Sequence, residues 1–216
     1  MTDVLLVGDD KLVRRLLVRL RSNFNVVIAL DHSSNLKRII KLVICRKLPL
    51  RILLKMAWAE WLRPDYPRMV APIIRSNAML LKLIHECGAR KVYLFRAGLI
   101  INSTLLTEDM EILNVHCSRL PEYDGLCALD RAMQDGALRQ CATLHRVTTK
   151  IDAGEVLQTR PFQLDPSLTY ADNEERAYEA GIELLVGVLS VIRLRPSITC
   201  DNFSGFNKQS KLESKK

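Results

Sequence analysis

The sequence contains no apolar run that approaches the roughly 20 residues needed to span a bilayer. Its first residues, MTDVLLVGDD, lack the basic segment that opens a secretory signal peptide, and two acids follow the apolar run directly. Its six cysteines form no CxxC pair and have no histidine at the spacing of a zinc site. We therefore expect a cytoplasmic protein with free thiols, no structural metal and no stable membrane insertion.

Two nucleotide-binding signals are also missing. The loop after the first apolar run, residues 8–11, reads GDDK and lacks the GxGxxG pattern of a dinucleotide site, and its two acids would repel a phosphate. The net charge is +8, but no aromatic-basic platform or recognisable nucleic-acid module accompanies it. The basic charge therefore does not predict a nucleic-acid partner.

Apolar residues make up 48% and charged residues 26% of the 216 residues, which excludes wholesale disorder and allows a sizeable core. We expect one domain over residues 1–195, followed by a polar, basic tail at 196–216 that is disordered.

Strand and helix signals alternate along the chain. Apolar runs at 4–8 and 26–30 flank a stretch at 12–20 with helical spacing, which is the opening of a parallel strand–helix–strand unit. Residues 34–63 read as helix, broken near Pro49. Further strands are expected at 91–95, 111–116, 141–147 and 155–164, and further helices at 76–87, 126–134 and 169–193. The sequence therefore predicts an α/β fold with a mostly parallel central sheet flanked by helices.

One stretch is strongly basic, because no acid lies between Asp31 and Glu60. It could bind phosphates, nucleic acid or a membrane surface, or it could be a solvated helical face. Its basic residues are Lys37, Arg38, Lys41, Arg46, Lys47, Arg51 and Lys55.

The run ILNVHCSRLPEYDG, residues 112–125, carries the main chemical signal. Asn114 and His116 lie two apart in a predicted strand, so both side chains project from the same face. Asp152 follows in KIDAGEV, on a loop that contains glycine. Acyl transfer to an amine requires a donor for the oxyanion, a proton carrier of near-neutral pKa and a carboxylate that orients that carrier. Asn114, His116 and Asp152 are the residue types that these three tasks need.

Three other positions have open interpretations. Cys117 beside His116 suggests a nucleophile, but neighbours on a strand point to opposite faces, so we expect the two side chains to diverge. His145 is either a residue close to the site or a core histidine. Asn173 and Glu174, near the start of the last helix, are expected on a solvated face.

The motif Asn-x-His-x-Ser, then Leu-Pro-x-Tyr-x-Gly, then a later Asp-x-Gly, resembles the formyltransferases that use 10-formyltetrahydrofolate. The resemblance is strong from about Lys91 to Val156 and weak before Lys91. The positions that match are Asn114, His116, Ser118, Leu120, Pro121, Tyr123, Gly125, Asp152 and Gly154.

The resemblance implies a Rossmann-like fold, the donor 10-formyltetrahydrofolate and the catalytic residues Asn114, His116 and Asp152. It also implies that the pterin lies against the turn Phe95 to Asn102 and the segment before Asp152. The cofactor-binding residues would be Phe95, Arg96, Gly98, Leu99, Ile100, Ile101, Thr149, Lys150 and Ile151. The residues on the substrate side would be Ser118, Tyr123 and Gly125.

The acceptor is the least defined part of the resemblance. Cys117 stands where the family usually has proline or glycine, and Asp124 where it often has arginine. About 20 polar residues follow Pro196, which does not suggest a tRNA-binding domain, and the loop at 8–11 is not a phosphate-cradling Gly-Ser-Asn. We expect a small-molecule amine, the amino group of a nucleotide-linked sugar. Glycinamide ribonucleotide, hydroxyornithine, a non-catalytic folate- or nucleotide-binding module and a homodimer stay open.

Overall fold

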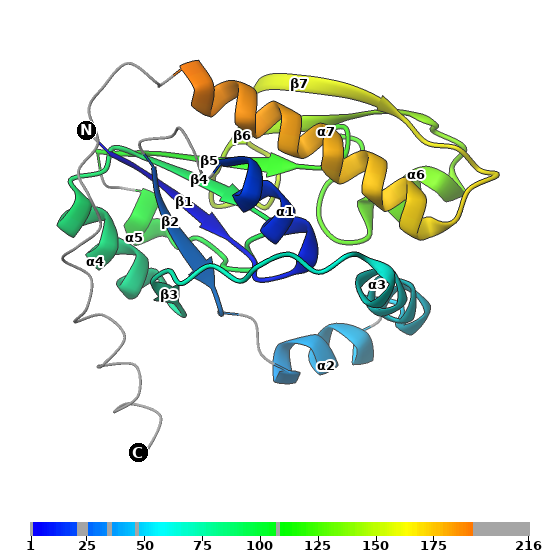
Figure 1. The fold of residues 1–216 in the computed structure, drawn as a ribbon, viewed down its shortest axis with the longest axis horizontal. Helices are drawn as coiled ribbons and strands as arrows, with labels where there is room; N and C mark the ends of the chain where they lie inside the picture. Colours follow the sequence, from blue (N-terminus) through cyan, green and yellow to red (C-terminus); the bar gives the residue numbers. More distant parts are fainter. Residues whose placement is uncertain (1, 21–25, 34–35, 46–47, 107–108, 192–216) are drawn as a thin grey trace.

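The computed structural model describes residues 2–20, 26–33, 36–45, 48–106 and 109–191. Their centre is one seven-stranded sheet with the order β3-β2-β1-β4-β5-β6-β7 (Figure 1). Strands β1 to β5 pair in parallel, and β6 and β7 add an antiparallel hairpin. The strands are β1 (Asp3–Val7), β2 (Val26–Asp31), β3 (Ile73–Ile74), β4 (Lys91–Phe95), β5 (Glu111–His116), β6 (Arg139–Arg146) and β7 (Val156–Gln163). The predicted α/β fold with a mostly parallel sheet is confirmed.

Helices cover both faces of the sheet. On one face, α1 (Lys11–Leu20) and α7 (Tyr170–Val191) pack on side chains such as Leu5, Phe95 and Val115. On the other face, α4 (Asn77–Cys87) and α5 (Ser103–Leu106) pack on the alternate residues, such as Leu6 and Ile112. This alternation is the two-residue period of a strand with both faces buried.

The predicted opening unit is confirmed, because β1 and β2 pair in parallel across α1. The short strand β3 was not among the predicted strands, because two residues are too short for a periodic signal. The helix predicted at 76–87 is confirmed as α4. Ser76 Oγ accepts a hydrogen bond from Met79 N, and Gly88 ends the helix with a φ of 58°. The expected end of the domain at 195 and the tail 196–216 lie outside the described residues.

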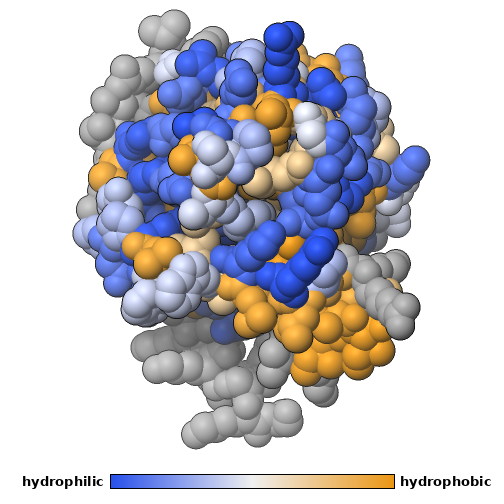
Figure 2. Space-filling view, turned by 90° about the vertical axis from the view of Figure 1, so that its right-hand side faces the viewer, coloured by the Kyte–Doolittle hydropathy of each residue, from blue (hydrophilic) through white to orange (hydrophobic). Residues whose placement is uncertain are grey.

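The helical stretch expected at 34–63 forms α2 (Leu36–Ile44) and α3 (Leu50–Leu62), with Pro49 at the N-cap of α3. Helix α3 contacts α7, and Figure 2 shows a continuous hydrophobic area at the height that α2 and α3 have in Figure 1. The short helix α6 (Ala128–Gln134) lies between the site loop and β6. In the described part of the chain, no helix is both long and apolar enough to cross a membrane.

Candidate active site

The candidate site lies at the carboxyl end of β5. The antiparallel register with β6 places Asn114 opposite His145, and His116 opposite Thr143. Paired residues point to the same face of a sheet, so the two histidines and Asn114 lie on the side that α4 and α5 cover. The carboxyl ends of parallel strands are where α/β proteins form ligand sites.

Asp152 joins the loop after β5 to the turn between β6 and β7. It lies on the turn between β6 and β7 with a φ of 50°, and its Oδ2 accepts a hydrogen bond from Gly125 N at 2.8 Å. Oδ2 is also 3.5 Å from His116 Nδ1, and Oδ1 is 3.5 Å from His145 Nε2. One carboxylate therefore contacts both imidazoles and the loop 119–125.

Gly154 allows this turn to close against β6. A Cβ atom at this position would lie 1.8 Å from the Arg146 carbonyl oxygen, far inside van der Waals contact. Any larger residue would push the turn, and Asp152 with it, away from the histidines.

Both ring nitrogens of His116 face acceptors. Nε2–H donates to the Tyr123 carbonyl at 2.7 Å, which leaves Nδ1 toward Asp152. Burial lowers the pKa of His116 and the nearby Asp152 charge raises it, with a net lowering below the usual 6.5. The ring is therefore neutral near pH 7, yet it has a carboxylate in place to stabilise the protonated form.

Asn114 is oriented by His145. The Asn114 amide donates from Nδ2 to His145 Nε2 at 3.1 Å, and His145 Nδ1–H donates to the Arg146 carbonyl at 2.9 Å. These bonds require the neutral tautomer of His145 that has its proton on Nδ1. His145 is 2% exposed. An amide nitrogen has two N–H groups, so Asn114 can hold this bond and still present a donor to a ligand. His145 belongs to the polar cluster, which settles its open interpretation.

Asp152 is ionised in this setting. Burial raises its pKa, but His145 and His116, when protonated at low pH, and the Gly125 N–H lower it by more, so its pKa lies below the usual 3.8. A carboxylate that stays ionised beside two imidazoles can orient either ring and stabilise the positive charge that a ring gains when it is protonated.

Cys117 diverges from His116 as predicted. Its thiol faces α7, where a Cβ atom on Gly181 would lie 2.7 Å from Cys117 Sγ. Burial raises the pKa of the thiol to about 12. A neutral thiol on the opposite face of the sheet cannot serve as the nucleophile of this site.

The expected pterin turn is held by an acid that sequence reasoning missed. Asp31, at the end of β2, accepts hydrogen bonds from the backbone N–H groups of Gly98 and Leu99, the latter at 2.9 Å. Leu99 and Ile101 are buried in the core under α4, whereas Ile100 is exposed. An acid directly after a buried strand is the signal that could have indicated Asp31.

Two of the expected turn residues point elsewhere. Phe95 is buried in the core beneath α7. Arg96, with a φ of 54°, stacks 4.2 Å from the ring centroid of Tyr178 and pairs with Asp10 at 2.5 Å. The structure therefore directs both side chains toward α7. Asp10, in the loop that lacked a phosphate signature, is internally paired.

The remaining predicted residues divide between the cluster and its surroundings. Thr149, Lys150 and Ile151 lie exposed on the turn before Asp152. Ser118 is buried and its hydroxyl donates to the Cys117 carbonyl at 2.8 Å. The Tyr123 hydroxyl donates to Asp135 at 3.3 Å, so its contribution to the cluster is its carbonyl. Gly125 contributes its N–H.

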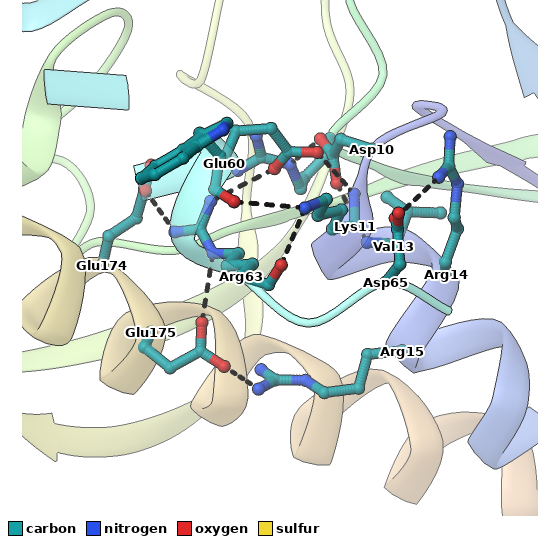
Figure 3. A network of polar contacts seen from close by, with 12 residues as sticks. Asp10, Lys11, Val13, Arg14, Arg15, Glu60, Arg63, Asp65, Glu174 and Glu175 are labelled. Carbon is teal, nitrogen blue, oxygen red and sulfur yellow. Dashed lines mark hydrogen bonds and ion pairs between the residues drawn. The ribbon is translucent and has the colours of Figure 1, made fainter. Parts of the chain in front are cut away.

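The expected solvated face at the start of α7 is wrong. Asn173 and Glu174 are 0% and 2% exposed. Glu174 pairs with Arg63 at 2.5 Å, and Asn173 Oδ1 accepts a hydrogen bond from Asp165 N at 2.7 Å (Figure 3 shows the Arg63 pair). Both residues are buried because each has a hydrogen-bond partner: Glu174 bonds to Arg63, which is 111 residues away, and Asn173 to the nearby turn at Asp165.

Within the described ranges, no group of three or more His, Cys, Asp and Glu side chains is placed to hold a metal ion.

The family is shown by sequence comparison. A sequence model of the formyl transferase family matches residues 66–189, more than half of the chain. Methionyl-tRNA formyltransferase from Rickettsia rickettsii (strain Iowa) is 26% identical over 147 residues, which cover 67% of this chain and 48% of that protein. The chain spans about half the length of the curated relatives it matches.

Solved structures share the fold. Phosphoribosylglycinamide formyltransferase from Anaplasma phagocytophilum has a TM-score of 0.61 at 18% identity, covering 93% of this chain and 90% of that chain. A sugar N-formyltransferase from a Shewanella species has a TM-score of 0.59 at 15% identity, covering 94% and 75%. The family match over residues 66–189 includes the polar cluster of Asn114, His116, His145 and Asp152. The chain belongs to the formyl transferase family.

Proposed function

We propose that this chain transfers a formyl group from 10-formyltetrahydrofolate to a primary amine. The observation that carries the proposal is the Asp152 carboxylate, 3.5 Å from both His116 and His145, with the Asn114 amide bonded to the second ring. This cluster supplies an amide donor, a neutral imidazole and a fixed carboxylate, which are the groups that acyl transfer to an amine needs.

In the proposed reaction, the amine nitrogen attacks the formyl carbon and forms a tetrahedral intermediate with an oxyanion. The Asn114 N–H donates to this oxyanion. His116 takes the proton that the amine loses, and Asp152 stabilises the resulting imidazolium. The bond from carbon to the folate nitrogen then breaks, and His116 returns the proton to that nitrogen. The products are an N-formyl amine and tetrahydrofolate.

This role requires His116 to change its hydrogen bonds. Nε2 donates to the Tyr123 carbonyl, so it has no lone pair for the amine. If the ring proton moves to Nδ1 and is donated to Asp152, Nε2 becomes a base. The Nε2 lone pair would then repel the carbonyl of Tyr123, so the ring or the loop 119–125 shifts when the acceptor binds.

The backbone shape and the exposure of two segments support the proposed binding of the folate donor. Asp31 fixes the backbone of the turn at Gly98 and Leu99, and Ile100 is exposed there. The exposed turn at 149–151 leads directly into Asp152. A folate whose pterin is bound by main chain between these segments would present the formyl group on its N10 atom to the cluster.

For the acceptor, we propose the amino group of a nucleotide-linked sugar. A cavity of about 640 Å³ lies beside the first loop, lined by Lys11, Arg14 and Arg68, with Tyr66 and two acids. Lys11 Nζ donates to the Trp61 and Arg63 carbonyls, and Arg14 pairs with Asp9 and Asp65. A nucleotide would therefore be bound there by Arg68 and the ring of Tyr66. A sugar N-formyltransferase is among the proteins with this fold, and a glycinamide ribonucleotide enzyme shares it too, which keeps that amine as the alternative.

The test is transfer of label. The protein is incubated with 10-formyltetrahydrofolate labelled at the formyl carbon and a panel of acceptors: nucleotide-amino sugars, glycinamide ribonucleotide, hydroxyornithine and methionyl-tRNA. Product masses are then read. One labelled nucleotide-sugar product is expected, and a product from another acceptor would replace the sugar assignment while keeping the reaction.

A non-catalytic binding module is the rival from another class. A ligand that binds the folded state raises its melting temperature. Stabilisation by 5-formyltetrahydrofolate together with labelled product supports the enzyme. Stabilisation without product from any acceptor supports the module.

A further inference from the structure

The outer side of α3 carries an apolar stripe formed by Leu50, Leu54, Trp58 and Trp61. These residues recur every three or four positions and therefore lie on one face of the helix. Each is more than half exposed, and the two tryptophan rings lie 5.1 Å apart. Helix α2 adds exposed isoleucines, Ile40 and Ile44, and Figure 2 shows a continuous hydrophobic area at the height that α2 and α3 have in Figure 1. A patch of this kind marks a binding surface.

The inner side of α3 is already packed, so the stripe does not belong to the core. Ile52 and Ala59, on the inner side, are buried. At the end of the helix Arg63 pairs with Glu174 at 2.5 Å and with Glu175 at 3.3 Å, both on α7 (Figure 3). A buried ion pair that loses a partner is costly, so these contacts hold α3 in one orientation. The stripe therefore faces away from the body of the protein.

The charges around the stripe are of one sign. Arg51 and Lys55 lie on α3 next to the stripe, Lys41 lies on α2, and Glu60 is the one acid in these two helices. Glu60 accepts a hydrogen bond from Lys11 N at 2.8 Å and lies on the inner side. Arg51 and Lys55 lie 3.4 and 3.3 Å from Asp130 of α6, yet their side chains stay about half exposed. The rim of the stripe is therefore basic.

We propose that α2 and α3 dock this chain on an anionic lipid bilayer, with the apolar stripe in the headgroup boundary. Tryptophan and leucine on one face, with lysine and arginine beside them, is the composition of helices that lie in a membrane interface. Lys and Arg can extend along an apolar surface and keep their charges at the lipid phosphates. A second copy of the chain fits less well, because its basic rim would face an identical basic rim.

The chain has two tryptophans, Trp58 and Trp61, and both lie in the stripe. Tryptophan emission therefore reports on this surface alone. The full chain is titrated with vesicles of phosphatidylcholine and phosphatidylglycerol in equal parts, and with vesicles of phosphatidylcholine alone. A shift of the emission to shorter wavelength with the anionic vesicles, reduced at high salt, is expected. No shift, or an equal shift with both vesicles, would overturn the proposal.

A stripe variant and a matched control locate the contact. Leu54→Gln with Trp58→Gln should weaken co-sedimentation with the anionic vesicles by at least about tenfold, because two apolar anchors are lost. Val70→Gln alters a 92% exposed residue outside the helices and should leave binding unchanged. Circular dichroism checks the fold of both. If light scattering instead finds a dimer that the stripe variant separates, without vesicle binding, the stripe binds a second copy and the proposal is wrong.

Discussion

The Asp152 carboxylate lies 3.5 Å from His116 Nδ1, although 36 residues separate them in the chain. The carboxylate also accepts the Gly125 N–H, so the turn after β6 is tied to the loop after β5. The Asp152 carboxylate is therefore in place to stabilise the imidazolium before His116 accepts a proton. Pre-organisation of this kind needs no rearrangement of solvent when charge develops.

The first prediction concerns this pair. His116→Ala and Asp152→Asn should each lower formyl transfer by at least about a hundredfold, because proton transfer loses its carrier or the carrier's partner. Melting temperatures should change little, since neither side chain is part of a hydrophobic core cluster. Near-normal turnover in either variant, measured with an established acceptor, would remove these residues from the mechanism.

The second prediction separates a donor from the residue that positions it. Asn114→Ala should lower kcat by about 10²–10³, the usual effect of losing one oxyanion donor. His145→Ala should also lower kcat, through misplacement of Asn114, with KM for the folate little changed. His145→Gln can still accept from Asn114 and should recover part of the rate. Equal loss in His145→Ala and His145→Gln would argue against a positioning role.

The third prediction is the titration of His116. Burial lowers its pKa, so its ring should titrate below 6.5 and transfer should stay flat as pH falls through 7 before it declines. Asp152 raises that pKa, so Asp152→Asn should move the midpoint to lower pH. Nuclear magnetic resonance of the four histidines, with His116→Gln for assignment, measures both values. A midpoint above 6.5, or an upward move in Asp152→Asn, would contradict the electrostatic account.

The same lowered pKa affects stability. The unfolded chain binds a proton on this histidine at a higher pH than the folded chain does. Stability should therefore fall as pH drops below 6.5 toward the folded pKa, and His116→Gln should remove that part of the decline.

The fourth prediction uses two glycines of α7. Gly181→Ala places a Cβ atom 2.7 Å from Cys117 Sγ and 3.1 Å from the Phe95 ring, and should destabilise the protein by about 1–3 kcal/mol. Gly187→Ala meets nothing within 4 Å and should stabilise by about 0.5–1 kcal/mol. Urea denaturation compares them. Adding Cys117→Ala to Gly181→Ala should restore part of the loss, and no recovery would place the strain elsewhere.

Much of the site follows from local pattern. The two-residue spacing of Asn114 and His116 fixes a shared face on any strand, and the divergence of Cys117 follows from the same rule. The opening βαβ unit and the caps at Ser76 and Gly88 are equally local. These features needed no knowledge of how distant segments meet.

The rest depends on contacts between distant segments. His145 reaches Asn114 because β6 pairs with β5 in one register among several, and no local signal sets that register. Asp31 reaches the turn at Gly98 across 67 residues, and Glu174 reaches Arg63 across 111. Their burial could not be predicted, because an acid without a visible partner is expected at the surface.

The most direct measurement is a comparison of donor binding and transfer in one variant. Wild-type protein and His116→Ala are mixed with labelled 10-formyltetrahydrofolate, and both bound folate and labelled product are measured. The account predicts comparable folate binding in both proteins and labelled product from the wild type alone. Transfer at an equal rate by the two proteins would contradict the central claim that the cluster of Asn114, His116 and Asp152 carries the reaction.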